Sequence, residues 1–209
     1  MTSPRLQLAA ALLAAAILSF VPVLNLPFVW LATFFHELSH GLAALATGGQ
    51  VVRIELSLNG SGVCYTRGGN AFLIALSGYL GASLFGVALW WLSGHPSRQS
   101  LLRWGLLLLV AASLVLWGRD MLTLAMLLVL LAGLWWLGKG GNRLRWLWLL
   151  MAAAVLLNAL QSPLYLGQGQ LGDAGTLSQL TGLPPMLFVF LWLIAGLLSI
   201  GWCFKRGKA

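Results

Sequence analysis

The chain has 209 residues, of which 60% are hydrophobic and only 8% are charged, whereas a soluble domain carries about 25% charged residues. This composition excludes a water-soluble protein and predicts one that crosses a membrane several times. The 12 lysines and arginines give a net charge of +8, but they are scattered between apolar runs. Such cations are typical of loops beside anionic lipid headgroups of a bilayer, and no basic patch predicts a nucleic-acid partner.

The two cysteines, Cys64 and Cys203, lie far apart and define neither a disulfide framework nor a thiolate metal cluster. The first apolar run, Leu6–Leu24, is longer than a signal-peptide core and lacks a clear small-residue cleavage site before Asn25. We therefore interpret this run as a membrane helix that the protein retains.

Seven apolar runs approach the length of about 20 residues that a helix needs to cross the hydrocarbon of a bilayer. Tryptophans lie near many of their ends, as expected of interfacial anchors. The fourth and fifth runs are separated only by residues 118–120, and one helix through both would be about 55 Å long, so we predict a tight turn between them. The runs are Leu6–Leu24, Pro27–Ala46, Ala71–Leu92, Leu101–Trp117, Met121–Leu137, Leu144–Leu160 and Met186–Phe204.

Two segments do not fit a membrane helix. Residues 50–67 alternate apolar and polar side chains and turn at Asn59-Gly60, which is the strongest short-range signal for a β-hairpin. Residues 161–185 are rich in Gly, Gln and Pro and predict a loop with one short helix, about Ala174 to Leu180. We predict a single all-α polytopic membrane domain over residues 1–209, with about seven transmembrane helices and a small β-hairpin after the second helix.

Basic residues are divided unevenly between the two sides of the membrane that seven spans define. One side holds only Arg5, Arg53, Arg67 and Arg119. The positive-inside rule therefore favours a cytoplasmic C-terminus. The side that includes the C-terminal tail holds Arg98, Arg103, Lys139, Arg143, Arg145, Lys205, Arg206 and Lys208.

Within the second apolar run, the sequence HELSH places His36, Glu37 and His40 among apolar side chains. Residues i and i+4 of a helix lie on one face, so the two imidazoles can occupy two corners of a tetrahedral zinc site. In an H-E-x-x-H motif (HExxH), the glutamate acts as general base toward the water that the metal activates. Polar residues in membrane helices can serve only as interhelical hydrogen-bond partners, but so dense an ionisable cluster predicts a functional zinc site.

The stretch HELSHGLAALATGGQVVRIELSLNGSGVCYTRGG, with SGYLGASLFG after it, resembles the core of the site-2 protease family of intramembrane zinc metallopeptidases. It is most similar to a short bacterial branch without PDZ or CBS domains. The resemblance implies a zinc helix (27–47), a β-hairpin (50–67) beside the active site, and a third zinc ligand from a distant aspartate. It also implies an integral protein of the bacterial cell (inner) membrane that acts on membrane proteins.

The segment SGYLGASLFG spaces its small residues Gly78, Ala82 and Gly86 four apart. Small residues at this interval let two membrane helices approach closely. We therefore predict that this helix packs against the zinc helix, which is a structural role and not a chemical one.

A catalytic zinc usually has three protein ligands, and the third ligand here has few candidates: Asp173, Asp120, Glu55, His95 and Cys64. The chain crosses the membrane four times between the loop after the second run and the loop 161–185. Asp173 therefore returns to the side on which the HELSH helix ends, whereas His95 falls on the opposite side. We favour Asp173, although it can also cap the short helix that follows it.

The other two acidic residues have simpler explanations. Asp120 lies beside Arg119 in a turn, which predicts a solvated ion pair. Glu55 shares a strand face with Arg53, which predicts a cross-hairpin salt bridge and not metal ligation.

The second motif of the family, Asn-x-x-Pro followed shortly by Asp-Gly, is altered in this chain. NALQSP spaces Asn158 and Pro163 more widely, and GDAG separates Asp173 from Gly175 by one residue. The resemblance implies that Asn158 holds a substrate backbone, but an asparagine in a membrane helix can equally bridge two helices.

These features predict a zinc-dependent intramembrane endopeptidase in which His36, His40 and Asp173 bind Zn²⁺ and Glu37 is the catalytic base. Its substrate would be a membrane protein with a transmembrane or membrane-proximal segment that is locally unwound, because an intact helix hides its carbonyls. One alternative is a metal-ion transporter, which would need further acids or histidines on other spans. Another is a noncatalytic relative that binds membrane proteins, against which the intact Glu37 argues.

Overall fold

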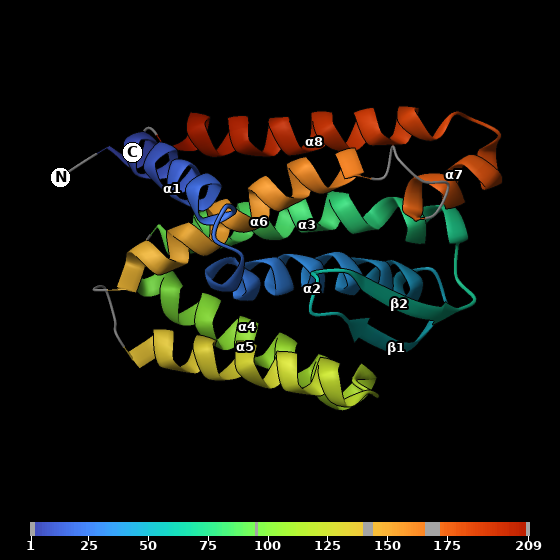
Figure 1. Cartoon of the computed structure of the whole chain (residues 1–209), viewed down its shortest axis with the longest axis horizontal. Coiled ribbons are helices and arrows are strands. Elements are labelled where there is room, and N and C mark those ends of the chain that lie inside the picture. The colour runs from blue at the N-terminus through green and yellow to red at the C-terminus, as the bar shows by residue number, and fades with distance from the viewer. Residues whose placement is uncertain (1–2, 95, 140–143, 166–171, 208–209) are drawn as a thin grey trace.

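The structure, a computed structural model, describes residues 3–94, 96–139, 144–165 and 172–207. Within these ranges the molecule is a helical bundle with a small two-stranded sheet at one end (Figure 1). The elements are α1 (Pro4–Leu18), α2 (Pro22–Ala46), β1 (Gln50–Leu56), β2 (Gly62–Arg67), α3 (Ala71–Ser93), α4 (Pro96–Trp117), α5 (Met121–Lys139), α6 (Arg145–Tyr165), α7 (Asp173–Thr181) and α8 (Pro185–Arg206).

Each of the seven predicted apolar runs contains a helix, and the short helix expected in the 161–185 loop is α7. Four helices, α3, α4, α6 and α8, are individually long and apolar enough to cross a membrane. The helices α1 and α2 qualify only together, as a bent pair, and α5 is a shorter apolar helix. The protein is therefore an integral membrane protein, but the predicted number of seven spans is not confirmed.

The chain breaks between α1 and α2, inside the first predicted run. Pro22 begins α2, and Val21 before it is not helical, because a residue that precedes proline is disfavoured in the helical conformation. The two helices are bent by 116°. Arg5 Nε donates a hydrogen bond to the carbonyl of Phe204 at 3.1 Å. The start of α1 thus lies beside the end of α8 (Figure 1), and Arg5 is not on the opposite side from that end of α8, as seven spans would require.

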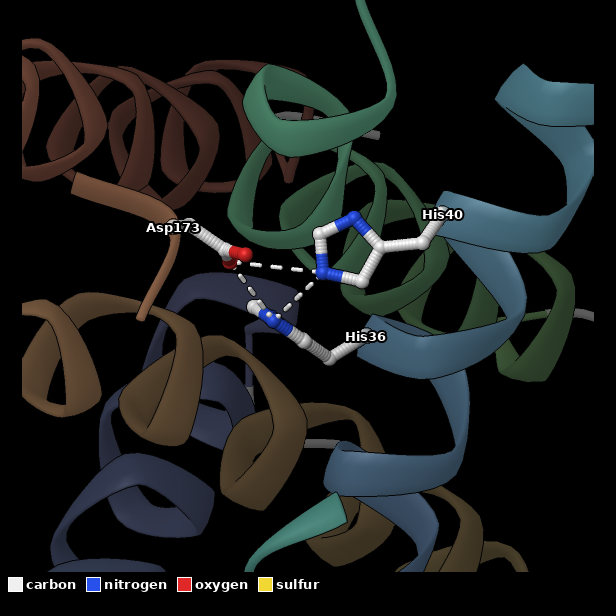
Figure 2. Close-up of side chains that lie close together, drawn as sticks. All are labelled: His36, His40 and Asp173. Carbon is white, nitrogen blue, oxygen red and sulfur yellow. Dashed lines mark hydrogen bonds and ion pairs between the residues drawn. The ribbon is translucent and has the colours of Figure 1, made fainter. Parts of the chain in front are cut away.

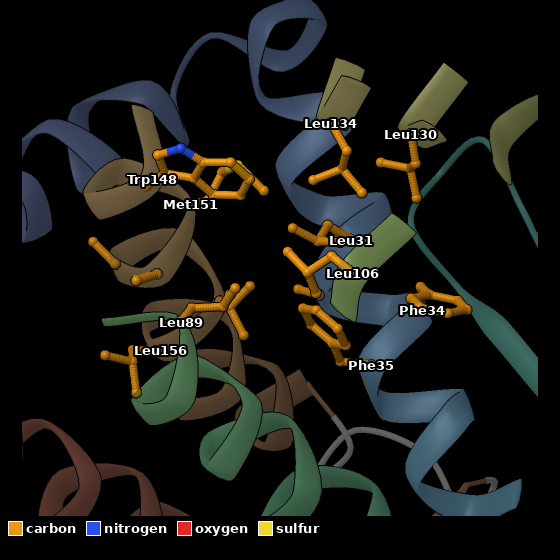
Figure 3. Packing of buried hydrophobic residues seen from close by; sticks show 14 of the residues in the cluster. Leu31, Phe34, Phe35, Leu89, Leu106, Leu130, Leu134, Trp148, Met151 and Leu156 are labelled. Carbon is orange, nitrogen blue, oxygen red and sulfur yellow. The ribbon is translucent and has the colours of Figure 1, made fainter. Parts of the chain in front are cut away.

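The core of the bundle lies where α3 packs along both α2 and α6. Leu31 and Phe35 of α2, Leu89 of α3, and Trp148 and Leu156 of α6 belong to one buried cluster (Figure 3). The helix α8 covers α3 and α6, and α4 and α5 form an antiparallel pair on the other side of α2 (Figure 1).

Small residues of α3 allow the close approach that their spacing predicts. A Cβ added at Gly78 would lie 2.5–2.6 Å from imidazole atoms of His36 and His40 on α2. A Cβ added at Gly86 would instead lie 2.8 Å from Leu156 of α6. The predicted packing against the HELSH helix is confirmed at Gly78, while the end of the small-residue row packs against a different helix.

The β-hairpin forms at the predicted residues, with β1 and β2 antiparallel and paired from Gln50–Arg67 to Leu56–Gly62. The turn is closed by the side chain of Asn59, whose Oδ1 accepts a hydrogen bond from Ser61 N at 3.1 Å. The outer edge of β1 is covered by α5, because the backbone N–H of Leu56 donates to Thr123 Oγ1 at 2.8 Å. In the described part of the chain β2 pairs only with β1, so its outer edge stays unpaired.

Candidate metal centre

The helix α2 carries His36, Glu37 and His40 on the side that faces the interior of the bundle. Glu37 and His40 are buried, and the His36 side chain is 16% exposed. Because the helix holds residues i and i+4 on one face, the Nε2 atoms of His36 and His40 lie only 3.0 Å apart. This half of the site follows from local structure alone.

The other half of the site comes from α7, whose first residue is Asp173. Asp173 Oδ2 lies 3.0 Å from His36 Nε2 and 3.3 Å from His40 Nε2 (Figure 2). The helix α7 is held in place by apolar packing, since Leu177 is buried in a cluster with Tyr79 and Trp192. Asp173 therefore returns to the side on which the HELSH helix ends, as the sequence predicts.

The three donor atoms fit a tetrahedral metal ion. Zinc bonds of about 2.0–2.1 Å at the tetrahedral angle separate neighbouring ligand atoms by about 3.3–3.4 Å. The three separations here range from 3.0 to 3.3 Å. Among the described residues, His36, His40 and Asp173 form the one group of His, Cys, Asp or Glu side chains arranged to hold a metal ion.

Both imidazoles are oriented by α3. His40 Nδ1 lies 2.6 Å from the carbonyl oxygen of Ile74, and because a carbonyl only accepts, Nδ1 carries the proton. The lone pair of His40 Nε2 is then free for a metal ion, as in most histidine ligands. The His36 ring packs edge-on against the ring of Tyr79, with their centroids 4.3 Å apart.

The Glu37 side chain packs against the strand β2 of the hairpin. A Cβ added at Gly62 of β2 would lie 2.9 Å from Glu37 Oε1, so the glycine lets the strand pass close to the carboxylate. A hydrogen bond joins Glu37 to the backbone of Cys64 in the same strand. The carboxylate therefore lies between the two histidines and the strand β2.

Asp120, a rival for the third ligand, is a helix cap. Its Oδ1 accepts a hydrogen bond from the backbone N–H of Thr123 at 2.8 Å, in the position of an N-cap of α5. Burial alone would raise the pKa of this carboxyl, but the hydrogen bonds from Thr123 outweigh burial and lower the pKa. Arg119 donates to the backbone carbonyls of Leu116 and Gly118, so the ion pair predicted between Arg119 and Asp120 is wrong.

The remaining candidate ligands do not join the group. Glu55 forms its ion pair with Arg53 at 2.6 Å within the strand β1, so the salt bridge predicted across the hairpin is wrong. Across the hairpin, the Arg53 guanidinium lies 3.9 Å from the centre of the Tyr65 ring. Cys64 lies near Glu37, and burial, reinforced by that carboxylate, raises the pKa of its thiol to about 12. His95 lies outside the described residues.

The site opens into a cavity of about 770 Å³ lined by α2, α3, α6, α7 and the hairpin. Asn158 of α6 lines this cavity together with Ser162. The hydroxyl of Ser162 donates a hydrogen bond to Asn158 Oδ1 at 3.0 Å. This bond does not involve the side-chain amide nitrogen of Asn158. The hydrogen bond lies within α6, so it does not bridge two helices.

Three residues that shape the site are not among those that the sequence predicts: Ile74, Tyr79 and Ser162. Tyr79 occurs within SGYLGASLFG, beside the glycine that lets the two histidines approach, so its position was a usable signal. Ile74 contributes its backbone carbonyl group, and the identity of a side chain does not predict such a role. The role of Ser162 follows only from the structure, in which one turn of helix places its hydroxyl next to Asn158.

The fold and the site together define a membrane protein with a buried HExxH helix and a convergent carboxylate. A family model described as Peptidase M50B-like matches residues 8–203 of the chain. The chain therefore belongs to this family of site-2 proteases and is, at the level of the family, a membrane metallopeptidase. No curated protein and no solved structure gave a significant match to the chain.

Proposed function

We propose that the protein is a zinc-dependent intramembrane endopeptidase that hydrolyses peptide bonds of membrane proteins in a bacterial cell membrane. The convergence of His36, His40 and Asp173, with Glu37 buried beside them, carries this proposal. Two histidines and a carboxylate are typical of catalytic zinc sites, which keep one coordination position open, whereas structural zinc sites usually have four protein ligands. The cavity supplies the space that a substrate needs at that open position.

Each side chain of the site has a distinct role in this proposal. Zinc, when bound, polarises the scissile carbonyl and lowers the pKa of the attacking water. Glu37 removes a proton from the water and delivers it to the leaving amine. The amide nitrogen of Asn158, oriented by Ser162, donates a hydrogen bond to the substrate backbone.

The strand β2 presents the substrate. Its residues Gly62, Val63, Cys64 and Thr66 line the cavity, and its outer edge is the unpaired one. An extended segment added to this edge would gain main-chain hydrogen bonds. Such a segment exposes the carbonyl that a transmembrane helix keeps engaged in its own hydrogen bonds.

The two alternative functions have less support. A metal-ion transporter needs a series of sites along its path, and the described residues form one group of potential metal ligands. A noncatalytic binding protein has no use for a buried glutamate beside the two histidines. The transporter and the binding protein both leave Glu37 without a role.

The replacement Glu37→Gln tests the proposal. The purified variant should keep one zinc ion per chain, because Glu37 is not a ligand, while cleavage falls by at least about 100-fold for loss of the general base. The substrate is a synthetic transmembrane peptide with a central Asn-Gly-Pro break, reconstituted with the protein in vesicles. Zinc is measured by mass spectrometry, and cleavage by the appearance of the two fragments.

The control is Glu55→Gln, which changes the hairpin glutamate and should preserve both zinc and cleavage. If Glu37→Gln cleaves the peptide as fast as the unchanged protein does, the proposed chemistry is wrong. Chelation of the metal gives an independent check, because activity must disappear and must return when zinc is added back.

A further inference from the structure

Tyr79 of α3 lies next to the candidate metal centre. Its ring meets the His36 ring edge-on, with centroids 4.3 Å apart and the ring planes at 69°. Tyr79 lines the same cavity as His36, His40 and Asp173. The residue is only 9% exposed, so the tyrosine belongs to the interior of the site and not to the outer surface of the bundle.

Contacts with α2, α7 and α8 hold the Tyr79 ring in place. Besides its contact with His36 of α2, the ring packs against the ring of Trp192 of α8, with centroids 4.7 Å apart. Trp192 is itself fixed, because its Nε1 donates a hydrogen bond to the carbonyl of Leu76, about one turn before Tyr79, at 3.1 Å. Leu177 of α7 belongs to the same buried cluster. The position of the Tyr79 hydroxyl group is therefore set by packing before any ligand binds.

The Tyr79 hydroxyl group has no hydrogen-bond partner among the described residues. Two other hydroxyl groups that line the cavity do have one, since Thr33 donates to the carbonyl of Gly60 at 2.7 Å and Ser162 donates to Asn158. Buried hydroxyl groups usually have a partner, because leaving one unpaired costs free energy. A molecule in the cavity can supply the acceptor that the described part of the chain does not.

Tyr79 and Glu37 approach the metal ligands from different sides. Glu37 packs against β2, whereas Tyr79 packs against Trp192 of α8. The hairpin and α8 lie on opposite sides of α3 (Figure 1). A peptide carbonyl bound between them would have the general base on one side and a neutral hydrogen-bond donor on the other.

We propose that Tyr79 is a further catalytic residue, whose hydroxyl group donates a hydrogen bond to the oxygen of the scissile carbonyl. This inference rests on the proposed peptidase function. When water adds to the carbonyl carbon, the C–O double bond becomes a single bond and the oxygen gains negative charge. A donor held at that oxygen stabilises the charge as it develops. Tyr79 keeps its proton throughout, so Glu37 remains the group that moves a proton from the water to the leaving amine.

The variant Tyr79→Phe removes the hydroxyl group and keeps the ring that packs against His36 and Trp192. With the peptide of the Glu37→Gln experiment, kcat should fall by at least about 10-fold, since loss of one such donor costs about 100–1,000-fold where no metal shares the charge. KM should change by less than about threefold, because the lost interaction forms only in the transition state. Zinc content should stay at one ion per chain. The control Tyr165→Phe removes the same atom from an exposed ring of α6 and should keep full activity.

Binding of an inert analogue gives a readout that needs no turnover. In a phosphinic analogue of the peptide, a tetrahedral phosphinate replaces the scissile amide and carries negative charge on oxygen permanently. The zinc-loaded variant Tyr79→Phe should bind this analogue at least about 10-fold more weakly than the unchanged protein does. A thiol analogue lacks that oxygen, so both proteins should bind it equally. If the hydroxyl group only supported the structure around His36, the variant would bind both analogues more weakly or neither.

The results separate this inference from the peptidase function. If the unchanged protein cleaves the peptide and Tyr79→Phe cleaves it equally fast, the role of Tyr79 is overturned and the peptidase proposal stands. If the unchanged protein cleaves nothing but its binding of the phosphinic analogue depends on the Tyr79 hydroxyl group, the donor is supported and the peptidase proposal is refuted. Loss of zinc from Tyr79→Phe, or failure of the unchanged zinc-loaded protein to bind the phosphinic analogue, would also overturn the inference.

Discussion

The two halves of the candidate metal centre are built in different ways. On α2, one turn of helix sets the separation of His36 and His40, so their arrangement needs only the local backbone. Asp173 reaches the same point from α7, and its position depends on how α7 packs against α3 and α8. We call the pair His36 and His40 the local half of the site and Asp173 the remote half. The local half depends little on changes elsewhere in the fold, whereas the position of the remote half depends on the packing of α7.

The largest expected effect is the loss of either half. His36→Ala and Asp173→Ala should each weaken zinc binding by more than about 100-fold, because even loss of a residue that only supports a ligand costs 10–100-fold. Zinc affinity is measured by competition with a chromophoric chelator. Asp120→Ala is the matched control and should bind zinc normally. If zinc is retained without Asp173 but lost without Asp120, the remote half has been assigned to the wrong carboxylate.

A smaller effect is expected from Gly78 of α3, which packs against the two histidines of the local half. In Gly78→Ala the new Cβ would collide with both imidazoles, so we expect zinc affinity to fall by about 10–100-fold, as for other disturbances around ligands. Gly133→Ala adds the same methyl group to open space in α5 and should keep full affinity. Equal zinc binding by the two variants would show that the histidines have more room than the structure gives them.

The smallest effect concerns the hairpin, which joins the local half of the site to α5. Thr123→Val keeps the shape of a buried side chain but leaves the N–H of Leu56 without its acceptor. Such a loss costs about 1–3 kcal/mol. Unfolding by denaturant in mild detergent should report this decrease, while zinc stoichiometry stays unchanged. A variant as stable as the parent would mean that β1 does not depend on this anchor.

Most of the secondary structure follows from the sequence because apolar length and turn residues are local signals. The hairpin around Asn59 and the helices over the apolar runs are confirmed on this basis. The predicted number of spans is not confirmed, because a hydropathy pattern reports where apolar residues lie and does not detect a bend between two helices. Val21-Pro22 breaks the first run, and the contact between Arg5 and Phe204 shows that the start of α1 and the end of α8 lie at the same end of the bundle.

The errors at charged residues have a common cause. Arg119 and Asp120 are neighbours in the sequence, but each bonds to backbone groups at a helix end in preference to the other. Helix ends leave four carbonyls and four N–H groups without partners, and nearby charged side chains satisfy them. A prediction that pairs opposite charges because they are neighbours in the sequence does not consider these backbone groups as alternative partners.

The sequence by itself determined the local half of the candidate site, because the spacing of HELSH places two imidazoles on one face of a helix. It also narrowed the choice of third ligand, because the chain has only four acidic residues. The tertiary structure alone decided that Asp173 meets the histidines and that Gly62 lets β2 pass beside Glu37. These features depend on contacts between segments far apart in the chain, and such contacts are set by packing, which no local pattern of residues encodes.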